Sequence, residues 1–522
     1  MQRGGNGQVL PRARQAGVCL HVTALPGRYG IGEIGADAYA FVDSMCRMGL
    51  HVWQFLPLGP TAYGDSPYQP LSTFAGNEML IDVDDLLERG LVRRDETWAL
   101  SALPADHVDY GQLIPAKNEL LRLAAGRFHG RASSRQKARF DRFMDRHDDE
   151  WLHEYALFRI LKARHEQRPW TEWQREYVHH DDEALKRLEA GQAERIEAIK
   201  IVQFLFHDQW QRLRAYANES GVRLFGDMPI YIAHDSSDAW ANPELLRIDR
   251  DGRPDAVAGV PPDYFSQDGQ LWGNPLYDWP AHAETGYRWW IERLRATVEL
   301  ADMVRVDHFR GFEGYWAIPA DAGTARDGQW EPGPGDAIFD AMRVALGSLP
   351  IVAEDLGVIT PEVEALRDRH RIPGMVVLQF DVTEEDFSLE RVRENCVCYT
   401  GTHDNDTTLG WFLGSPDDIR SPDEIRQAQQ AALAITSGTP ETIATDLIRA
   451  AFSTAARLAI APMQDFLGLG SESRFNTPGK SRNNWRWRLS PGQLSDDLCD
   501  EIADTVSVSG RELHNDRVHA AS

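Results

Sequence analysis

The chain has 522 residues, with 55 Lys and Arg against 80 Asp and Glu, and therefore carries a net charge of −25. Nucleic acids and anionic membranes bind basic surfaces, so this balance argues against both as partners and favours a neutral ligand. The N-terminal residues Met1 to Gly17 contain no apolar core of a signal peptide, and no run of about 18 apolar residues occurs. We therefore expect a cytoplasmic protein without a membrane span.

The sulfur and tryptophan contents narrow the class of protein only slightly. The five cysteines have neither the spacing of a disulfide framework nor that of a zinc site, so we expect buried thiols. The 16 tryptophans are compatible with a ligand made of sugar rings, which stack on flat aromatic faces, although Trp is also a residue of protein cores.

Eight short segments rich in Val, Ile, Leu and Phe alternate with helical patterns, as expected for strands that are buried on both faces. One such helical pattern is Asp37–Met48. Eightfold alternation of strand and helix predicts an α/β protein with a (β/α)₈ barrel rather than an open sheet. The predicted strands are Gly17–Leu25, His51–Leu58, Arg223–Ile230, Met303–Phe309, Ile351–Glu354, Met375–Phe380, Cys396–Thr402 and Leu458–Met463.

Two connections are longer than a barrel requires, within what we expect to be a single catalytic barrel over residues 1–522. Residues 82–219 are highly charged with helical patterns, and we expect a mainly helical insertion that serves stability, assembly or a longer binding groove. Residues 233–287 are rich in Pro, Gly, Trp and Tyr, which predicts a loop-rich lid over the active site. Too little chain follows the eighth strand for a C-terminal β-sandwich domain.

Three of the predicted strands, or the turn directly after them, end on an acid: Asp307, Glu354 and Asp404. Catalytic groups of a parallel barrel lie at the carboxyl ends of its strands, so these acids are expected to converge. Such a set can supply a nucleophile, a general acid/base and a group that stabilises positive charge. This is the chemistry that cleaves and remakes glycosidic bonds.

Each acid also has a simpler interpretation. Arg305 and Asp307 point to one face of a strand, so the arginine either keeps a nucleophilic carboxylate ionised or forms a structural ion pair. Glu354 is either a general acid whose pKa is raised by two neighbouring carboxylates or a helix cap, a role that suits Asp355 better. His403 and Asp404 either bind a metal or support a sugar transition state, and the absence of a second histidine group favours the sugar.

The motifs RVDHFRGFEGYW, VAEDLG and GTHDNDT, in this order and spacing, resemble those of the 4-α-glucanotransferases of glycoside hydrolase family 77, the amylomaltases and disproportionating enzymes. Residues 64–69, 226–230, 259–265, 271–275 and 464–470 extend the resemblance, which covers residues 17–488. It implies a barrel with inserted subdomains, no metal or other cofactor, and no C-terminal sheet domain.

By this resemblance Asp307 is the nucleophile, Glu354 the general acid/base and Asp404 the stabiliser of the transition state. Arg305, His308 and His403 are expected to hold the sugar at the cleavage site. Further expected substrate contacts are Asp227, Tyr68, Ser66, Tyr264, Phe265, Trp272 and Asn476. For the aromatic residues, packing within the 259–275 loop is the competing interpretation.

The expected function is transfer of a segment of an α-1,4-glucan, such as a maltooligosaccharide, to the 4-hydroxyl of another glucan or of glucose. The expected mechanism is a retaining double displacement. An α-1,4-glucan hydrolase with the same acids is the alternative, and a catalytically silent glucan-binding protein is disfavoured because binding alone does not require the full set.

Overall fold

A computed structural model describes residues 9–262, 268–415, 418–480 and 482–511, except the side chain of Tyr63. Eight strands form one parallel sheet in the order β10-β11-β12-β1-β2-β3-β6-β9. The two end strands meet, because the Ala353 amide of β9 donates to the Pro373 carbonyl before β10 at 2.8 Å. The sheet therefore closes, which confirms the predicted (β/α)₈ barrel. Its strands are β1 Gln15–Cys19, β2 Val52–Gln54, β3 Arg223–Met228, β6 Met303–Val306, β9 Ile351–Ala353, β10 Gly374–Val377, β11 Cys396–Tyr399 and β12 Leu458–Pro462.

All eight predicted strands exist, but most extend less far than predicted. Residues 20–25 after β1 are buried as irregular chain and a 3₁₀ turn, and helix α14 (Leu378–Asp381) begins directly after β10. An apolar run in the sequence indicates buried residues. At the end of the barrel, residues remain buried beyond the last hydrogen-bonded strand residue. The apolar pattern therefore overstates strand length.

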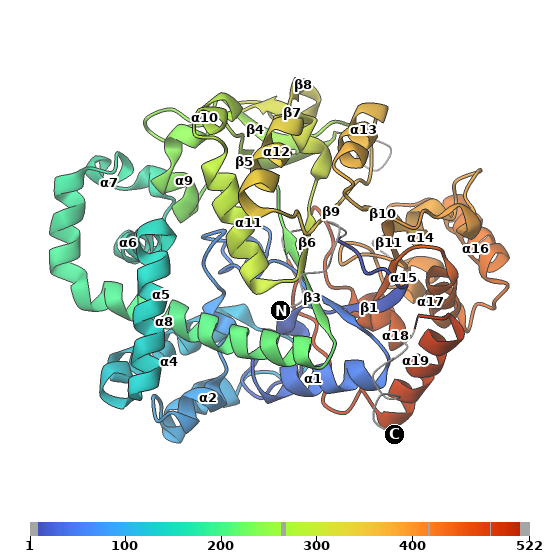
Figure 1. Ribbon diagram of the computed structural model, residues 1–522, viewed down its shortest axis with the longest axis horizontal. Helices are drawn as coiled ribbons and strands as arrows, with labels where there is room; N and C mark the ends of the chain where they lie inside the picture. The colour runs from blue at the N-terminus through green and yellow to red at the C-terminus, as the bar shows by residue number, and fades with distance from the viewer. Residues whose placement is uncertain (1–8, 263–267, 416–417, 481, 512–522) are drawn as a thin grey trace.

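Helices surround the barrel, and residues 82–219 contain seven α-helices, several of which lie at the left of Figure 1. Helix α8 (Asp182–Glu219) is kinked at Gln192 and ends next to β3. No sheet follows β12 in the described chain, and no helix in that part is long and apolar enough to span a membrane. The main helices are α1 Ala36–Arg47, α2 Val83–Glu88, α3 Trp98–Ser101, α4 Tyr110–Arg131, α5 Ser134–His147, α6 His153–Arg164, α7 Arg175–Val178, α8 Asp182–Glu219, α9 Ser237–Ala241, α10 Trp279–Glu284, α11 Arg288–Leu300, α12 Asp336–Leu346, α13 Pro361–Arg369, α15 Thr408–Leu413, α16 Pro422–Thr436, α17 Ile443–Ser453, α18 Met463–Phe466 and α19 Asp496–Val508.

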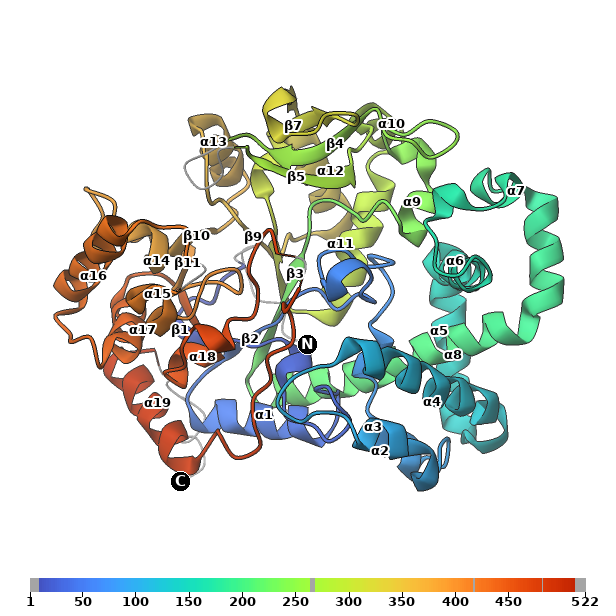
Figure 2. The same cartoon turned by 180° about the vertical axis from the view of Figure 1, so that it is seen from behind.

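A second sheet, which the sequence analysis does not anticipate, has four antiparallel strands in the order β5-β4-β7-β8. It takes β4 (Ala256–Val260) and β5 (Gln270–Pro275) from the segment expected to be loop-rich, and β7 (Gly314–Pro319) and β8 (Gln329–Pro332) from the chain after β6. Figures 1 and 2 show it beyond the ends of β3 and β6. The sheet therefore stands beside the carboxyl ends of these barrel strands.

Candidate active site

Alternation along the barrel strands brings the predicted polar residues to one place. Phe225, Met303 and Val352 belong to the apolar cluster inside the barrel. Side chains two residues apart on a strand share a face, so Asp227 follows Phe225 inward and Arg305 follows Met303. Glu354 stands in the same relation to Val352. The deep positions are thus apolar, and the positions at the carboxyl ends are charged.

The Arg305 guanidinium joins two of these acids. Its Nη1 lies 2.9 and 2.8 Å from the two carboxylate oxygens of Asp227, and its Nη2 lies 2.7 Å from Oδ1 of Asp307. The Asp227 side chain is 0% exposed, whereas that of Asp307 is 31% exposed. Arg305 therefore has a buried partner, Asp227, and an accessible one, Asp307, and the contact with Asp307 is compatible with both interpretations of that pair.

Glu354 lies in a different environment from Asp307. Its Oε2 accepts the His308 amide at 2.7 Å and its Oε1 accepts the Leu356 amide at 3.0 Å. Burial raises the pKa of Glu354 to about 7, and the charge of Asp307 adds to this rise while Arg305 and the two amides oppose it. Burial, rather than crowding by two carboxylates, is thus the main cause. The acid caps no helix, because α13 begins only at Pro361.

The neighbouring acid, Asp355, has a structural role. Its carboxylate accepts the Met375 amide at 2.7 Å and pairs with Arg367. It therefore links the end of β9 to β10, the two strands that close the barrel.

His308 has a left-handed backbone, with φ 52° and ψ 49°, which is uncommon for a residue other than glycine. This conformation turns the chain directly after Asp307 and accompanies the amide bond to Glu354. The side chain is half-buried, and its desolvation lowers the pKa of the imidazole to about 4, which keeps the ring neutral at pH 7. Nε2 of the ring has no hydrogen-bond partner within the described residues. The Trp272 ring of β5 packs on it edge to face, with the ring centres 4.8 Å apart.

Asp404 lies in the loop after β11, and its side chain is 42% exposed. Oδ1 accepts the Asn476 amide nitrogen at 2.6 Å, and Oδ2 lies 3.3 Å from Nε2 of His403. Arg474 holds the same loop, because its Nη2 donates to the Asp404 carbonyl at 2.6 Å and its Nε donates to the Asn476 carbonyl at 2.7 Å.

The loop after β2 completes the site. The Tyr68 hydroxyl donates to Oδ2 of Asp227 at 2.8 Å, and the Tyr68 ring stacks on His403 with centres 5.1 Å apart. Oγ of Ser66 accepts the Tyr68 amide at 3.2 Å. Tyr68 therefore connects the side of the site with Asp227 and Arg305 to the side with Asp404.

Comparison with known proteins identifies the family. A family model described as 4-alpha-glucanotransferase, glycoside hydrolase family 77, matches residues 20–495. The chain belongs to this family.

Individual relatives agree over nearly the whole chain. The 4-alpha-glucanotransferase of Thermus thermophilus is 46% identical over 491 residues, 93% of this chain and 96% of the relative. That of Synechocystis is 44% identical over 510 residues, 96% of this chain and 99% of the relative. The solved structure of the amylomaltase of Streptococcus agalactiae in complex with acarbose superposes with a TM-score of 0.89 at 36% identity, covering 96% of this chain and 100% of that one. The resemblance seen in the sequence is thus confirmed.

The structure brings together most, but not all, of the residues that were expected to form the site of this 4-alpha-glucanotransferase family member. Tyr264 and Phe265 lie outside the described residues. Sequence reasoning missed Arg474, whose position two residues before Asn476 was the only available signal, and it missed the backbone amides that hold Glu354. A backbone amide leaves no trace in residue type, because every residue except proline has one.

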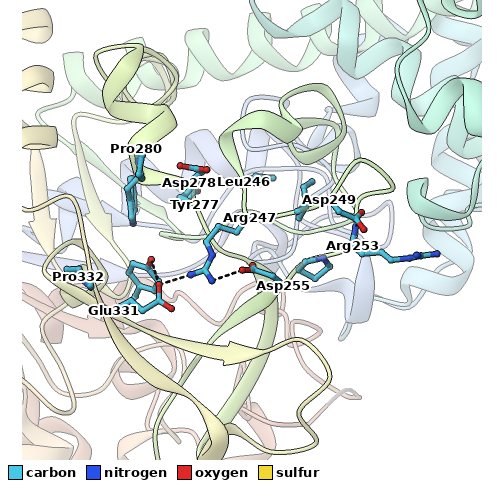
Figure 3. A pocket seen from close by; sticks show the side chains of 14 residues that line it. Leu246, Arg247, Asp249, Arg253, Asp255, Tyr277, Asp278, Pro280, Glu331 and Pro332 are labelled. Atoms are coloured by element: carbon cyan, nitrogen blue, oxygen red, sulfur yellow. Dashed lines mark hydrogen bonds and ion pairs between the residues drawn. The ribbon is translucent and has the colours of Figure 1, made fainter.

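A separate hollow of about 790 Å³ lies between the 246–255 segment, β7, β8 and α10. Figure 3 shows Arg247 at its centre, paired with Asp255 and Glu331. None of the three predicted catalytic acids lines it. In the part of the chain that the structure describes, no group of three His, Cys, Asp or Glu side chains is arranged to hold a metal ion.

Proposed function

We propose that this protein transfers a segment of an α-1,4-glucan to the 4-hydroxyl of an acceptor glucan or of glucose, with retention at the anomeric carbon. Its family and its relatives' names support the activity. One observation supports the mechanism most: Asp307 is paired with Arg305, whereas burial raises the pKa of Glu354 to about 7. Two carboxyls whose environments differ in this way can divide the roles of nucleophile and acid.

In the first displacement, an oxygen of Asp307 attacks the anomeric carbon and forms a glucosyl ester. Glu354 gives its proton to the departing glycosidic oxygen, whose bond to that carbon breaks, so the released glucan leaves with a neutral hydroxyl. Arg305 lies 2.7 Å from Oδ1 of Asp307 and holds this carboxylate in a fixed position for the attack.

In the second displacement, Glu354 is ionised and accepts the proton of the incoming 4-hydroxyl. That oxygen attacks the same carbon, the ester bond to Asp307 breaks, and an α-1,4 bond forms. Asp404 stabilises the positive charge that develops on the sugar ring in both steps, and Asn476 holds its carboxylate in place.

The remaining residues divide into those that touch sugar and those that position the acids. His403 and His308 are proposed to contact sugar hydroxyls, and the neutral His308 ring offers a buried Nε2 for this purpose. Asp227 is fully buried against Arg305 and Tyr68, so its main role is to fix Arg305. Ser66 orients Tyr68, because Oγ of Ser66 accepts the backbone amide of Tyr68. Trp272 packs on His308.

The decisive experiment incubates the protein with maltotriose and follows products and total reducing ends together. Transfer conserves reducing ends, so glucose, maltopentaose and longer chains should form while the total stays constant. A rising total with only shorter products would instead establish the hydrolase. Asp307→Ala should abolish turnover while leaving the fold intact, and an active variant would refute the assignment of the nucleophile.

A further inference from the structure

One face of the second sheet carries an aligned row of residues across all four strands. Leu271 of β5 pairs with Gly259 of β4, Gly259 pairs with Trp316 of β7, and Trp316 pairs with Trp330 of β8. Directly opposed residues in antiparallel strands project to the same side of a sheet. Trp272, next to Leu271, points to the other side and packs on His308. The row thus lies on the opposite face from this active-site contact, and it spans about 14 Å.

Trp330, at one end of this row, is both exposed and firmly held. It is 42% exposed, a large value for an indole on a strand. The Trp316 ring packs against it nearly edge to face, with ring centres 5.2 Å apart. The Arg310 guanidinium lies 3.7 Å from the centre of the Trp330 ring, and Arg310 itself is only 7% exposed. The buried Arg310 guanidinium therefore covers one face of the indole. The opposite face of the ring is the one open to solvent.

Arg310 ties this tryptophan to the loops of both proposed catalytic acids. It lies in the 3₁₀ turn Phe309–Phe312, three residues after Asp307. Its Nη1 donates to the carbonyl of Val358, four residues after Glu354. The Gly333 amide just after β8 also donates to the Glu313 carbonyl at 2.8 Å. Trp330 is thus fixed to the segments that position Asp307 and Glu354.

We propose that Trp330 is a stacking platform for a glucosyl residue of a long glucan, outside the subsites next to the acids. This inference rests on the proposed function, because the proposed ligand is the glucan that this function uses as its substrate. A pyranose ring offers an apolar face of C–H groups to an indole. Val358, whose carbonyl accepts the Arg310 guanidinium, is a second exposed apolar residue, and exposed Leu271 lies at the other end of the row. The net charge of −25 also favours a neutral ligand over an anionic one.

The test compares Trp330→Ala and Trp330→Phe with Trp98→Ala, which removes another exposed tryptophan, 78% exposed on α3. KM and kcat are measured with maltotriose and with maltoheptaose. For Trp330→Ala the ratio of the KM for maltoheptaose to the KM for maltotriose should rise about fivefold, the loss expected for one aromatic contact. Trp330→Phe should recover most of this loss, and Trp98→Ala should match the unmodified protein.

An unchanged ratio of the two KM values in Trp330→Ala would overturn the proposal. If both KM values rise equally, Trp330 serves only to cover Arg310, and if neither changes, Trp330 does not contact the substrate. Failure of the unmodified protein to disproportionate maltotriose would instead refute the proposed function, so the two failures are distinguishable.

A second measurement keeps the indole in place and does not depend on how Trp330→Ala folds. In the inactive Asp307→Ala protein, oxidation by N-bromosuccinimide is followed at individual tryptophans by peptide mass spectrometry. Maltoheptaose should slow oxidation of Trp330 severalfold and leave Trp98 unaffected. Equal rates at Trp330 with and without maltoheptaose would contradict the stacking platform.

Discussion

At the scale of single residues, the site depends on two carboxyls of similar chemistry that are placed differently. Asp307 has Arg305 at 2.7 Å, whereas Glu354 is half-buried and held by two backbone amides. Both residues were predictable as strand-end acids, but the cause of the raised pKa of Glu354 was not. Desolvation depends on everything that surrounds a side chain, and most of these neighbours are distant in sequence.

The pKa of Glu354 predicts how activity depends on pH. The first displacement requires the protonated form, and deprotonation with a pKa of about 7 removes it as pH rises. We expect kcat/KM for maltotriose to fall above neutral pH, approaching about tenfold per pH unit. Initial rates between pH 5 and pH 9 at constant ionic strength measure this decline, and a plateau extending to pH 9 would contradict it.

At the scale of elements, the second sheet is the main feature that sequence reasoning missed. β4 and β7 pair although about 55 residues separate them, and β8 is a short edge strand. Pairing between distant segments leaves little local pattern, so a stretch rich in Pro, Gly and Trp looks like a loop. In the structure, β4 and β5 form a hairpin that holds Trp272 on His308.

The position of Trp272 in this hairpin indicates that its side chain favours transfer over hydrolysis. Trp272→Ala would open a path for water beside His308, and water competes with the acceptor hydroxyl for the glucosyl intermediate. We expect the fraction of turnovers that create a reducing end to rise severalfold. Parallel measurement of glucose and total reducing ends from maltotriose gives this fraction. Trp272→Phe, which keeps a ring at this position, should lie close to the unmodified protein, and an unchanged fraction in Trp272→Ala would refute the role.

At the scale of the whole molecule, the end of the barrel opposite the acids is held by the last described residue. Arg511 is buried and donates to the carbonyls of Phe452, Gln15, Ala456 and Thr454 at 2.6 to 3.0 Å. These carbonyls precede β12 or lie at the start of β1. Arg511 therefore ties the chain after α19 to the amino ends of the barrel strands, the side where a barrel of this kind is stabilised rather than catalytically active.

Arg511→Ala should destabilise the protein without impairing catalysis. The substitution removes the Arg511 donor from four carbonyls, of which that of Thr454 keeps Arg14 as a donor, and it creates a cavity. We therefore expect a loss of about 3 kcal/mol in the free energy of unfolding. Urea unfolding monitored by circular dichroism measures this loss. Arg449→Ala, which removes an exposed arginine from α17, should cost less than about 0.5 kcal/mol. A fall in kcat for maltotriose at 25 °C in folded Arg511→Ala would contradict the separation of the two ends.

The barrel and the acids at its strand ends were predictable without coordinates, because buried strands have a local apolar pattern and the acids directly follow it. The sequence by itself also determined the family, since three motifs in fixed order are read without coordinates. The coordinates were needed to show that Asp227 pairs with Arg305, that Asn476 holds Asp404, and that a second sheet carries Trp272 and Trp330. Each of these features depends on contacts between segments that are distant in the chain, and the energy of such contacts depends on geometry that exists only after folding.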